Sequence, residues 1–440
     1  MNEQLTIKPR PLQLTIEKLV YGGDGLGRLP ADENGRGKAV FVPFVLPGEE
    51  VEAEALEARP GFVRGRLGKV LQTSPQRTEA RCPYFQRCGG CNYQHAAYEH
   101  QLENKAAILK ENLRRIAKLE LTTELNIHPS PPWNYRNRSR LKVRTVPEFV
   151  LGYYKFGSHD LLPVEECTIS SPLLNQTIGS IWRAGRMGKI ANGVEEIEFF
   201  CDADDAQVLI EVYCASGFSQ LAGEEMALAL RQHIPQVAGV VVFKRSVVSA
   251  EPQRVAFSGA SELNYKTQHG SYRVSGGAFF QTNRHVMDEL TDVVVQGRSG
   301  QMALDLYAGV GLFAVPLARS FAQVTAVESS QISQADLAYN CPANVQTVRT
   351  TVEQYLKNAP SRLSPDLVVL DPPRSGLGES VVRSLAALRT PRITYVSCDP
   401  ATLARDLSGL LKAGYRVEQA HLLDLFPQTY HLETVLHLAR

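Results

Sequence analysis

The sequence predicts an α/β protein in three parts: a small N-terminal β-barrel, a central α+β region and a C-terminal doubly wound domain of the Rossmann type. Residues 12–70 alternate short apolar runs with turns that contain Gly and Pro, which is typical of antiparallel strands. From about Ser271, apolar strands that end in small residues alternate with helices, which is typical of a parallel sheet. The expected boundaries of the three parts are 8–72, 73–270 and 271–440.

The N-terminal strands are expected to close into a five-stranded barrel of the oligonucleotide-binding (OB) type. Gly22, Gly23, Gly25 and Gly27 suit the tight turns or bulges at which the strands of a small barrel bend. Such a barrel can also exist without a ligand, so the pattern alone leaves nucleic-acid binding open. The segment 97–119 follows with helical periodicity and strong helix formers, and it predicts a long amphipathic helix.

Composition indicates a protein without membrane spans. The chain has 440 residues, of which 44% are hydrophobic and 21% are charged, and it contains no apolar run long enough to cross a membrane. The first ten residues are polar and resemble neither a secretory signal nor a transit peptide. We therefore expect a cytoplasmic protein with reduced thiols, whose eight cysteines are metal ligands, nucleophiles or core residues rather than disulfide partners.

The net charge of +1 conceals a strong asymmetry along the chain. Residues 59–144 hold 17 Lys or Arg against 6 Glu and no Asp, and this excess of positive charge favours a nucleic-acid partner. Five cations occupy every second position of one segment: Arg136, Arg138, Arg140, Lys142 and Arg144. On a strand they would share one face, which predicts a phosphate-binding surface. A solvated edge strand, protected from aggregation by its charges, is the alternative.

A glycine-containing loop at 305–311 connects a predicted strand with a predicted helix, and Glu328 ends the next strand. Glycines let the backbone approach a ligand, and an acid at that position can bind the hydroxyls of a ribose. The combination fits NAD as well as S-adenosylmethionine. Asp371, followed by two prolines at the end of the fourth strand, favours S-adenosylmethionine, although an ordinary turn would also explain it.

Cys398 lies in Val-Ser-Cys-Asp-Pro, directly after a predicted parallel strand. Ligands of open α/β sheets bind beyond the carboxyl ends of the strands, so this position favours a nucleophile over a buried core cysteine. A helix that begins near Pro400 is expected to lower the pKa of the thiol through its positive end. The cysteines at 201, 214 and 341 have no comparable placement and are expected to be structural.

Four further cysteines form a candidate metal site: Cys82, Cys88 and Cys91, which are close in sequence, and the distant Cys167. Such a set can supply four thiolates, and both zinc and an iron-sulfur cluster accept them. Gly89, Gly90 and Pro83 allow the bends that a loop needs to wrap a metal. Spacing alone does not decide between the two metals.

Together these motifs resemble the RNA uracil-5-methyltransferase family, in particular the bacterial ribosomal-RNA branch that carries a TRAM barrel and a 4Fe-4S cluster. The resemblance covers nearly the whole chain. It is carried by the barrel, the four cysteines, Phe279-Phe-Gln281-Thr-Asn283, the loop 305–311, Asp371-Pro-Pro-Arg374-Ser-Gly376, Ser397-Cys398-Asp399-Pro400 and His431-Leu-Glu433-Thr434. It implies an OB-like TRAM barrel at the N-terminus and a class I methyltransferase domain at the C-terminus.

The resemblance also implies the roles of individual residues. Cys398 would add to C6 of the uracil, and Glu433 would later remove the proton from C5. Positions that bind S-adenosylmethionine or the reacting base are matched by Gln281, Tyr307, Glu328, Asp371 and Thr351, the last where the family has Asn or Asp. Cys82, Cys88, Cys91 and Cys167 would hold the 4Fe-4S cluster.

The expected partner is RNA, with 23S ribosomal RNA favoured and transfer RNA as the alternative, and the expected protein is a monomer. Two other functions compete with this one. An amino-methyltransferase would use Asp371-Pro-Pro but leave Cys398 and Glu433 without a role. A non-catalytic RNA-binding or assembly factor would not need either residue.

Overall fold

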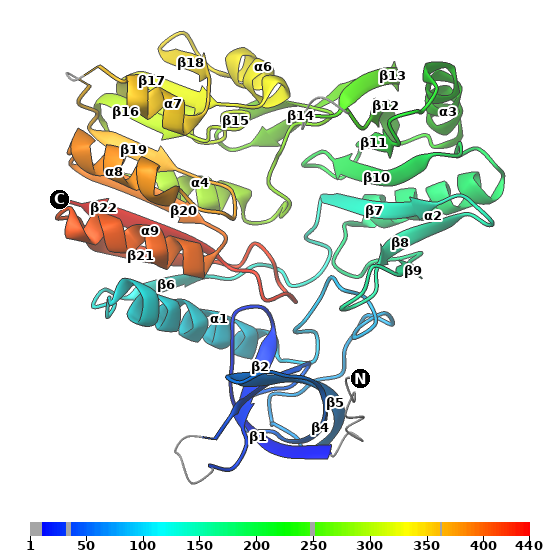
Figure 1. Ribbon diagram of the computed structural model, residues 1–440. Helices are drawn as coiled ribbons and strands as arrows, with labels where there is room; N and C mark the ends of the chain where they lie inside the picture. Colours follow the sequence, from blue (N-terminus) through cyan, green and yellow to red (C-terminus); the bar gives the residue numbers. More distant parts are fainter. Residues whose placement is uncertain (1–10, 32–36, 247–250, 361–362) are drawn as a thin grey trace, which may run out of the picture. The chain divides into compact units, whose positions relative to one another are not determined.

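The computed structural model describes residues 11–31, 37–246, 251–360 and 363–440 (Figure 1). The chain divides into two compact units. The first comprises residues 1–111 and 426–431, and the second comprises residues 112–425 and 432–440. Within the described ranges, every helix is too short or too polar to span a membrane.

The first unit contains a closed five-stranded barrel, as the alternating pattern predicts (Figure 1). Around the barrel the strands pair in the order β1 (Pro11–Leu19), β2 (Asp24–Arg28), β3 (Ala39–Pro43), β5 (Phe62–Gln72) and β4 (Glu50–Ala58). Val40, Val42 and Val51 are buried in its core. A Cβ atom at Gly25 would lie 2.3 Å from Val45 Cγ2, so a side chain at this position would clash with the core.

The predicted long helix is confirmed as α1 (Tyr98–Asn112), which continues into a π-helical turn, η1 (Leu113–Ala117). Within the first unit, α1 holds the segment 426–431 through reciprocal hydrogen bonds. Gln101 Nε2 donates to Gln428 Oε1 at 3.1 Å, and Gln428 N donates to Gln101 Oε1 at 3.0 Å. A segment near the end of the chain is thereby integrated into the N-terminal unit.

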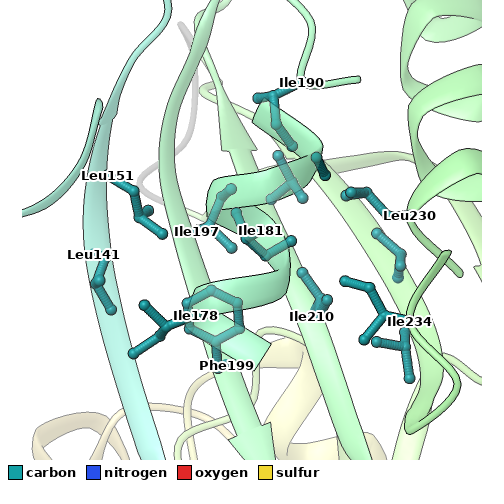
Figure 2. Packing of buried hydrophobic residues seen from close by; sticks show 14 of the residues in the cluster. Leu141, Leu151, Ile178, Ile181, Ile190, Ile197, Phe199, Ile210, Leu230 and Ile234 are labelled. Carbon is teal, nitrogen blue, oxygen red and sulfur yellow. The ribbon is translucent and has the colours of Figure 1, made fainter. Parts of the chain in front are cut away.

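The second unit contains a seven-stranded sheet that is covered on one face by α2 (Pro172–Arg186) and α3 (Gln220–His233). Its strand order is β13 (Gln253–Gly259), β12 (Val237–Lys244), β11 (Val208–Cys214), β10 (Val194–Cys201), β7 (Arg138–Arg144), β8 (Val150–Tyr154) and β9 (Leu161–Pro163). Figure 2 shows Ile178 and Ile181 of α2 packed against apolar side chains of this sheet. Since side chains alternate along a strand, the opposite face carries the charged residues of β7 and β10.

The second unit also contains the predicted doubly wound sheet, which has eight strands. Its order is β18 (Val345–Arg349), β17 (Phe321–Glu328), β16 (Gly300–Leu306), β19 (Leu367–Leu370), β20 (Arg392–Ser397), β22 (Glu433–Ala439), β21 (Arg416–Leu423) and β6 (Leu125–His128). The first five strands are parallel, and β22 runs antiparallel to both of its neighbours.

Helices connect the parallel strands, and a hairpin precedes them. The hairpin consists of β14 (Glu262–Thr267) and β15 (Gly270–Ser275). The helices are α4 (Met287–Val295), α5 (Ala314–Leu317), α6 (Gln331–Asn340), α7 (Val352–Asn358), α8 (Gly378–Leu388) and α9 (Pro400–Lys412). From β16 the chain continues outward to β17 and β18 and then returns to β19 on the other side of β16. This reversal creates the switch point at which such sheets bind ligands.

Candidate active site

The carboxyl ends of four parallel strands bring acids and a thiol to one edge of the eight-stranded sheet. Asp305 is the second-last residue of β16, and Glu328 is the last residue of β17. Asp371 directly follows β19, and Cys398 directly follows β20. The strands β16 and β19 flank the switch point, so these residues lie where a ligand of an open α/β sheet is expected.

The turn after β16 leaves space beside its backbone. Gly309 has a φ of 54°, and no described atom lies within 4 Å of the place that a Cβ would occupy. Gly309 N donates a hydrogen bond to Glu328 Oε2 at 2.9 Å, and Ser330 N donates to Glu328 Oε1 at 2.7 Å. The carboxylate of Glu328 is therefore fixed beside the glycine turn, in the position from which such acids bind ribose hydroxyls.

Asp305 is fully buried, and neither carboxylate oxygen meets hydrogen-bond criteria with any described residue. Burial and the charge of Asp371 raise the pKa of Asp305 to about 8, a rise that the Ala314 amide opposes. A buried carboxylate without compensation is costly, so its position favours a cationic ligand. Sequence reasoning named the loop but not this residue as a ligand. The available signal was a single acid in an otherwise apolar strand.

Strand pairing brings Cys398 and Glu433 to the same place. In the antiparallel pair β20 and β22, Val396 lies opposite Val435 and Ser397 lies opposite Thr434. One further step in this register places Cys398 opposite Glu433, which is almost completely buried. Burial and the charge of Asp371 raise the pKa of Glu433 well above its usual range. A thiol and a carboxyl of high basicity are thus neighbours at the ligand-binding edge.

The prediction that a helix end lowers the pKa of Cys398 is wrong. The helix α9 does begin at Pro400, but Asp399 caps it, and Asp399 Oδ1 accepts hydrogen bonds from Ala401 N at 3.0 Å and Thr402 N at 2.9 Å. Burial, Glu433 and Asp371 raise the pKa of the Cys398 thiol to about 12. Burial and these two carboxylates therefore disfavour the thiolate in the ligand-free protein.

Arg374 is the cation that opposes this rise. It lowers the pKa of Cys398 through its charge and a hydrogen bond, and its charge also lowers the pKa of Glu433. Arg374 belongs to one of the motifs that carry the family resemblance, but no role was predicted for it. A signal existed, because Arg374 lies only three residues after the acid that follows β19.

The remaining predicted cofactor residues differ in their surroundings. Tyr307 directly follows β16 with a φ of 68°, a conformation that is uncommon for any residue except glycine. Gln281 is buried in the segment after β15, two residues after Phe279, whose side chain is exposed. Thr351 is exposed, and its hydroxyl accepts a hydrogen bond from Gln354 N at 3.2 Å as the N-cap of α7. This capping role, signalled by a Thr followed three residues later by Gln, was missed.

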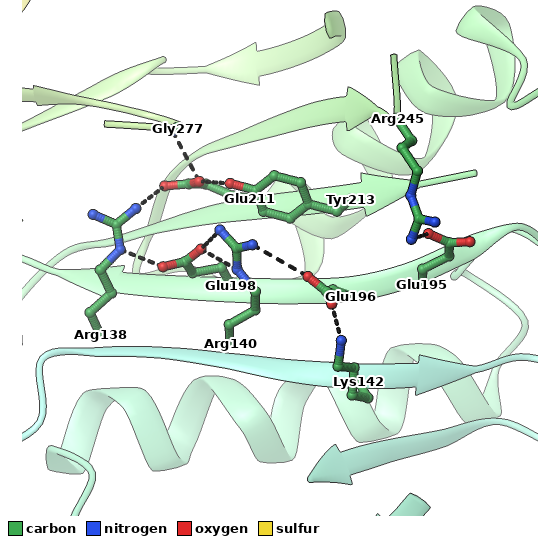
Figure 3. Close-up of polar contacts among 10 residues, drawn as sticks. All are labelled: Arg138, Arg140, Lys142, Glu195, Glu196, Glu198, Glu211, Tyr213, Arg245 and Gly277. Carbon is green, nitrogen blue, oxygen red and sulfur yellow. Dashed lines mark hydrogen bonds and ion pairs between the residues drawn. The ribbon is translucent and has the colours of Figure 1, made fainter. Parts of the chain in front are cut away.

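The structure does not support the predicted phosphate-binding face of β7, because three of its five predicted cations are paired with carboxylates of the same sheet (Figure 3). Arg138 pairs with Glu198 and Glu211, Arg140 pairs with Glu196 and Glu198, and Lys142 pairs with Glu196. The neighbouring antiparallel strand β10 places Glu196 opposite Lys142 and Glu198 opposite Arg140. The charge ladder, as we call these six residues, therefore neutralises itself within the sheet.

The charge ladder also contacts the segment that carries Gln281. Arg138 is buried, and its Nη1 donates to the carbonyl oxygen of Ala278 at 2.6 Å. Gly277 N donates to Glu211 Oε2 at 3.0 Å. Both contacts hold residues that precede Gln281 by three or four positions. Arg138 and Glu211 therefore support the backbone segment that leads to Gln281.

Cys82, Cys88 and Cys91 belong to the first unit and Cys167 to the second, and all four are partly buried. Gly90 N donates to Cys88 Sγ at 3.4 Å, and Cys82 N donates to Gln94 Oε1 at 3.0 Å. Among the residues that the structure describes, no three or more His, Cys, Asp or Glu side chains form a group that could hold a metal ion. The structure thus does not show the expected cluster.

Two family models match the chain. The TRAM domain matches residues 11–67, a range that begins with β1 of the closed barrel and ends within β5. The family described as tRNA (Uracil-5-)-methyltransferase matches residues 97–440, which include both large sheets. The second match spans more than half of the chain.

Similar proteins extend over the whole chain. An RNA methyltransferase of Aquifex aeolicus is 33% identical over 98% of this chain and 98% of its own length. The 23S rRNA (uracil(1939)-C(5))-methyltransferase RlmD of Pseudomonas putida is 32% identical over 96% of this chain and 92% of its own. The structure of Pyrococcus abyssi tRNA (uracil-54, C5)-methyltransferase, in complex with S-adenosyl-L-homocysteine, has a TM-score of 0.75 at 24% identity and covers 97% of this chain and 100% of its own. The matched family and these full-length similarities show that the chain belongs to the RNA uracil-5-methyltransferases.

Proposed function

We propose that this protein transfers a methyl group from S-adenosylmethionine to carbon 5 of a uridine in RNA, with Cys398 as a covalent nucleophile. The observation that carries the proposal is the register of β20 and β22, which sets Cys398 opposite Glu433 at the ligand-binding edge of the sheet. A methyltransferase for exocyclic amines would need neither a thiol nor a strongly basic carboxylate at these positions. Family membership supports the same reaction.

The residues at the switch point fit the proposed cofactor. The open space at Gly309 and the fixed carboxylate of Glu328 suit a nucleoside, and the fully buried carboxylate of Asp305 suits a positive charge. When bound, S-adenosylmethionine supplies an electrophilic methyl group and carries both an ammonium and a sulfonium charge. Gln281, Tyr307, Asp371 and Thr351 complete the set that we assign to the cofactor or the reacting base.

The proposed chemistry begins at the thiolate of Cys398, whose sulfur forms a bond with C6 of the uracil. The electrons of the C5–C6 double bond move toward C5 and O4, so C5 becomes nucleophilic and accepts the methyl group. Glu433 then removes the proton from C5, the double bond re-forms, and the sulfur leaves C6. The target base must leave its stack to reach Cys398, since C6 is not accessible inside a stacked strand.

Glu433→Gln tests this sequence of steps, because the glutamine keeps the size of the side chain and removes the base. Methylation should proceed and elimination should stall, so the variant should accumulate a methylated RNA adduct that survives denaturation and shifts the protein band. Cys398→Ala should form neither adduct nor product. Complete turnover by Glu433→Gln without a trapped species would show that another group accepts the proton.

For the RNA class we propose 23S ribosomal RNA. It is supported by the similarity to RlmD of Pseudomonas putida over 96% of the chain and by the TRAM barrel. The structural similarity to a transfer-RNA enzyme at 24% identity supports only the fold. Methylation of purified ribosomal and transfer RNA from a strain that lacks the gene should proceed on the ribosomal RNA, and methylation of transfer RNA alone would reverse the assignment.

We also propose that Cys82, Cys88, Cys91 and Cys167 hold a 4Fe-4S cluster. Three of these thiols lie within ten residues, and the amide of Gly90 donates to Cys88 Sγ, a contact that suits a cluster-bound sulfur. In addition, Cys82 N donates a hydrogen bond to Gln94 Oε1. The other side-chain atom of this amide group, Gln94 Nε2, is buried without a hydrogen-bond partner among the described residues. Protein purified without oxygen should be brown and contain iron. Colourless protein with one equivalent of zinc would contradict the assignment.

A further inference from the structure

The loop after Asp371 is attached to α9 at three backbone positions, those of Arg374, Ser375 and Leu377. Thr402 Oγ1 donates to the carbonyl oxygen of Arg374 at 3.2 Å. Arg405 Nη2 donates to the carbonyl oxygen of Ser375 at 2.8 Å, and Leu377 N donates to Asp406 Oδ2 at 2.7 Å. The three side chains follow one another at positions that share one face of a helix, and we call Thr402, Arg405 and Asp406 the α9 clamp.

Asp406 joins this loop to the strand that precedes the nucleophile. It is almost completely buried, and its Oδ2 also accepts a hydrogen bond from the hydroxyl of Tyr395 on β20 at 2.9 Å. Arg405 Nε donates to Asp406 Oδ1 at 2.9 Å. A Cβ atom at Gly376 would lie 2.4 Å from Asp406 Oδ2, so the loop lies directly against the carboxylate. One buried side chain therefore fixes the loop relative to β20 and α9 at once.

We propose that the α9 clamp is a positioning device that holds the Arg374 guanidinium at the Cys398 thiol. An arginine side chain loses considerable rotamer entropy when it is held in one place. Because the α9 clamp already fixes the backbone of the short loop that carries Arg374, less conformational entropy remains to be lost when the guanidinium is held. Burial and the carboxylates of Glu433 and Asp371 disfavour the thiolate of Cys398, and the Arg374 guanidinium opposes them, so the position of this guanidinium affects how much thiolate forms. This inference rests on the proposed role of Cys398 as the nucleophile.

Alkylation of Cys398 by iodoacetamide measures the thiolate directly and needs neither RNA nor cofactor. Mass spectrometry of the peptides separates Cys398 from the seven other cysteines. Asp406→Asn, which keeps the size of the side chain, should lower the rate between pH 8 and 9.5 about tenfold, the effect of raising the pKa of the thiol by about one unit. The result is independent of whether the protein methylates uridine, because no methyl transfer is measured.

Asp366→Asn is the matched control. Asp366 Oδ2 also accepts backbone hydrogen bonds, from Gln301 N at 2.7 Å and Met302 N at 3.0 Å, but it precedes β19 at the opposite end of the sheet. This variant should alkylate at the wild-type rate. Should Asp406→Asn fail to fold, Thr402→Val removes only the hydroxyl contacts and should slow alkylation by a smaller factor in the same direction.

Arg374→Gln separates positioning from a general loss of structure. If the clamp acts through Arg374, then adding Asp406→Asn to Arg374→Gln should slow alkylation no further. The proposal is overturned if Asp406→Asn alkylates as fast as Asp366→Asn. It is equally overturned if the tenfold effect persists in full when Arg374 is already replaced, because Asp406 would then act on Cys398 by another route.

Discussion

Replacing Arg138 by Met distinguishes a structural charge ladder from a phosphate-binding strand. The side chain of Arg138 is 7% exposed, and its partners Glu198 and Glu211 are 9% and 0% exposed. Removal of one partner from a buried ion pair costs about 3 to 5 kcal/mol, because the other charge stays buried without compensation. Glu211 would keep its hydrogen bonds from the Tyr213 hydroxyl and Gly277 N, at 2.6 Å and 3.0 Å. We therefore expect a loss of about 3 kcal/mol, the lower end of that range.

Urea denaturation at several pH values measures this loss. Burial raises the pKa of Glu211 even with Arg138 present, and removal of Arg138 would raise it further. A carboxyl whose pKa is higher in the folded than in the unfolded state contributes stability below the unfolded pKa, and this contribution disappears as pH rises through the folded pKa. The deficit of Arg138→Met should therefore be smallest near pH 4 and largest above neutral pH.

Lys142→Met is the matched control, because Lys142 belongs to the same ladder but its side chain is 34% exposed. It should cost no more than about 1 kcal/mol. Neither variant should change the slope of log affinity for RNA against log salt, whereas a lost phosphate contact would reduce it by about 0.7 to 0.9. Equal stability losses for both variants, together with a reduced salt slope for Arg138→Met, would refute the structural interpretation and restore the phosphate-binding one.

Two further predictions concern the ligand-binding edge. Asp305→Asn should weaken binding of S-adenosylmethionine in calorimetry and should stabilise the ligand-free protein above neutral pH. The pKa of Asp305 is raised to about 8, so its ionisation destabilises the folded state as pH rises. Equal pH dependence of stability in variant and wild type would contradict this. Gly309→Ala should cost about 1 to 2 kcal/mol of stability, because residue 309 has a positive φ. It should reduce cofactor affinity more strongly, since the alanine methyl group would enter the open space beside the turn. Unchanged affinity would show that the ligand lies elsewhere.

Local sequence patterns predicted the elements of this protein better than the contacts between them. The period of two in the barrel and the strand-helix alternation after about residue 271 concern neighbouring residues, and both predictions are confirmed. The cations of β7 also correctly indicated a strand. Their partners Glu196 and Glu198 lie on β10, more than fifty residues away, so the neutralisation of that face depended on a strand pairing that the local pattern does not contain.

The same limit applies to the candidate site. Motifs at the ends of predicted parallel strands were enough to bring Glu328, Asp371 and Cys398 to one edge, because parallel strands share that edge. The pKa of Cys398 could not be obtained in this way. It is set by burial, by carboxylates from two other strands and by Arg374, and the helix end that was expected to act on it is already occupied by Asp399.

The electrostatics of the edge connect cofactor binding with activation of the thiol. Asp305, Asp371 and Glu433 all have raised pKa values, and burial is the largest cause in each case. A cationic ligand at this edge stabilises the ionised carboxylates, and it also favours the thiolate of Cys398, because every negative charge nearby gains from the same positive charge. In the ligand-free protein Arg374 has this effect on the thiol, but burial and the carboxylates outweigh it, and the pKa of the thiol remains at about 12. A positively charged ligand is therefore expected to lower the pKa of the Cys398 thiol further than Arg374 alone does.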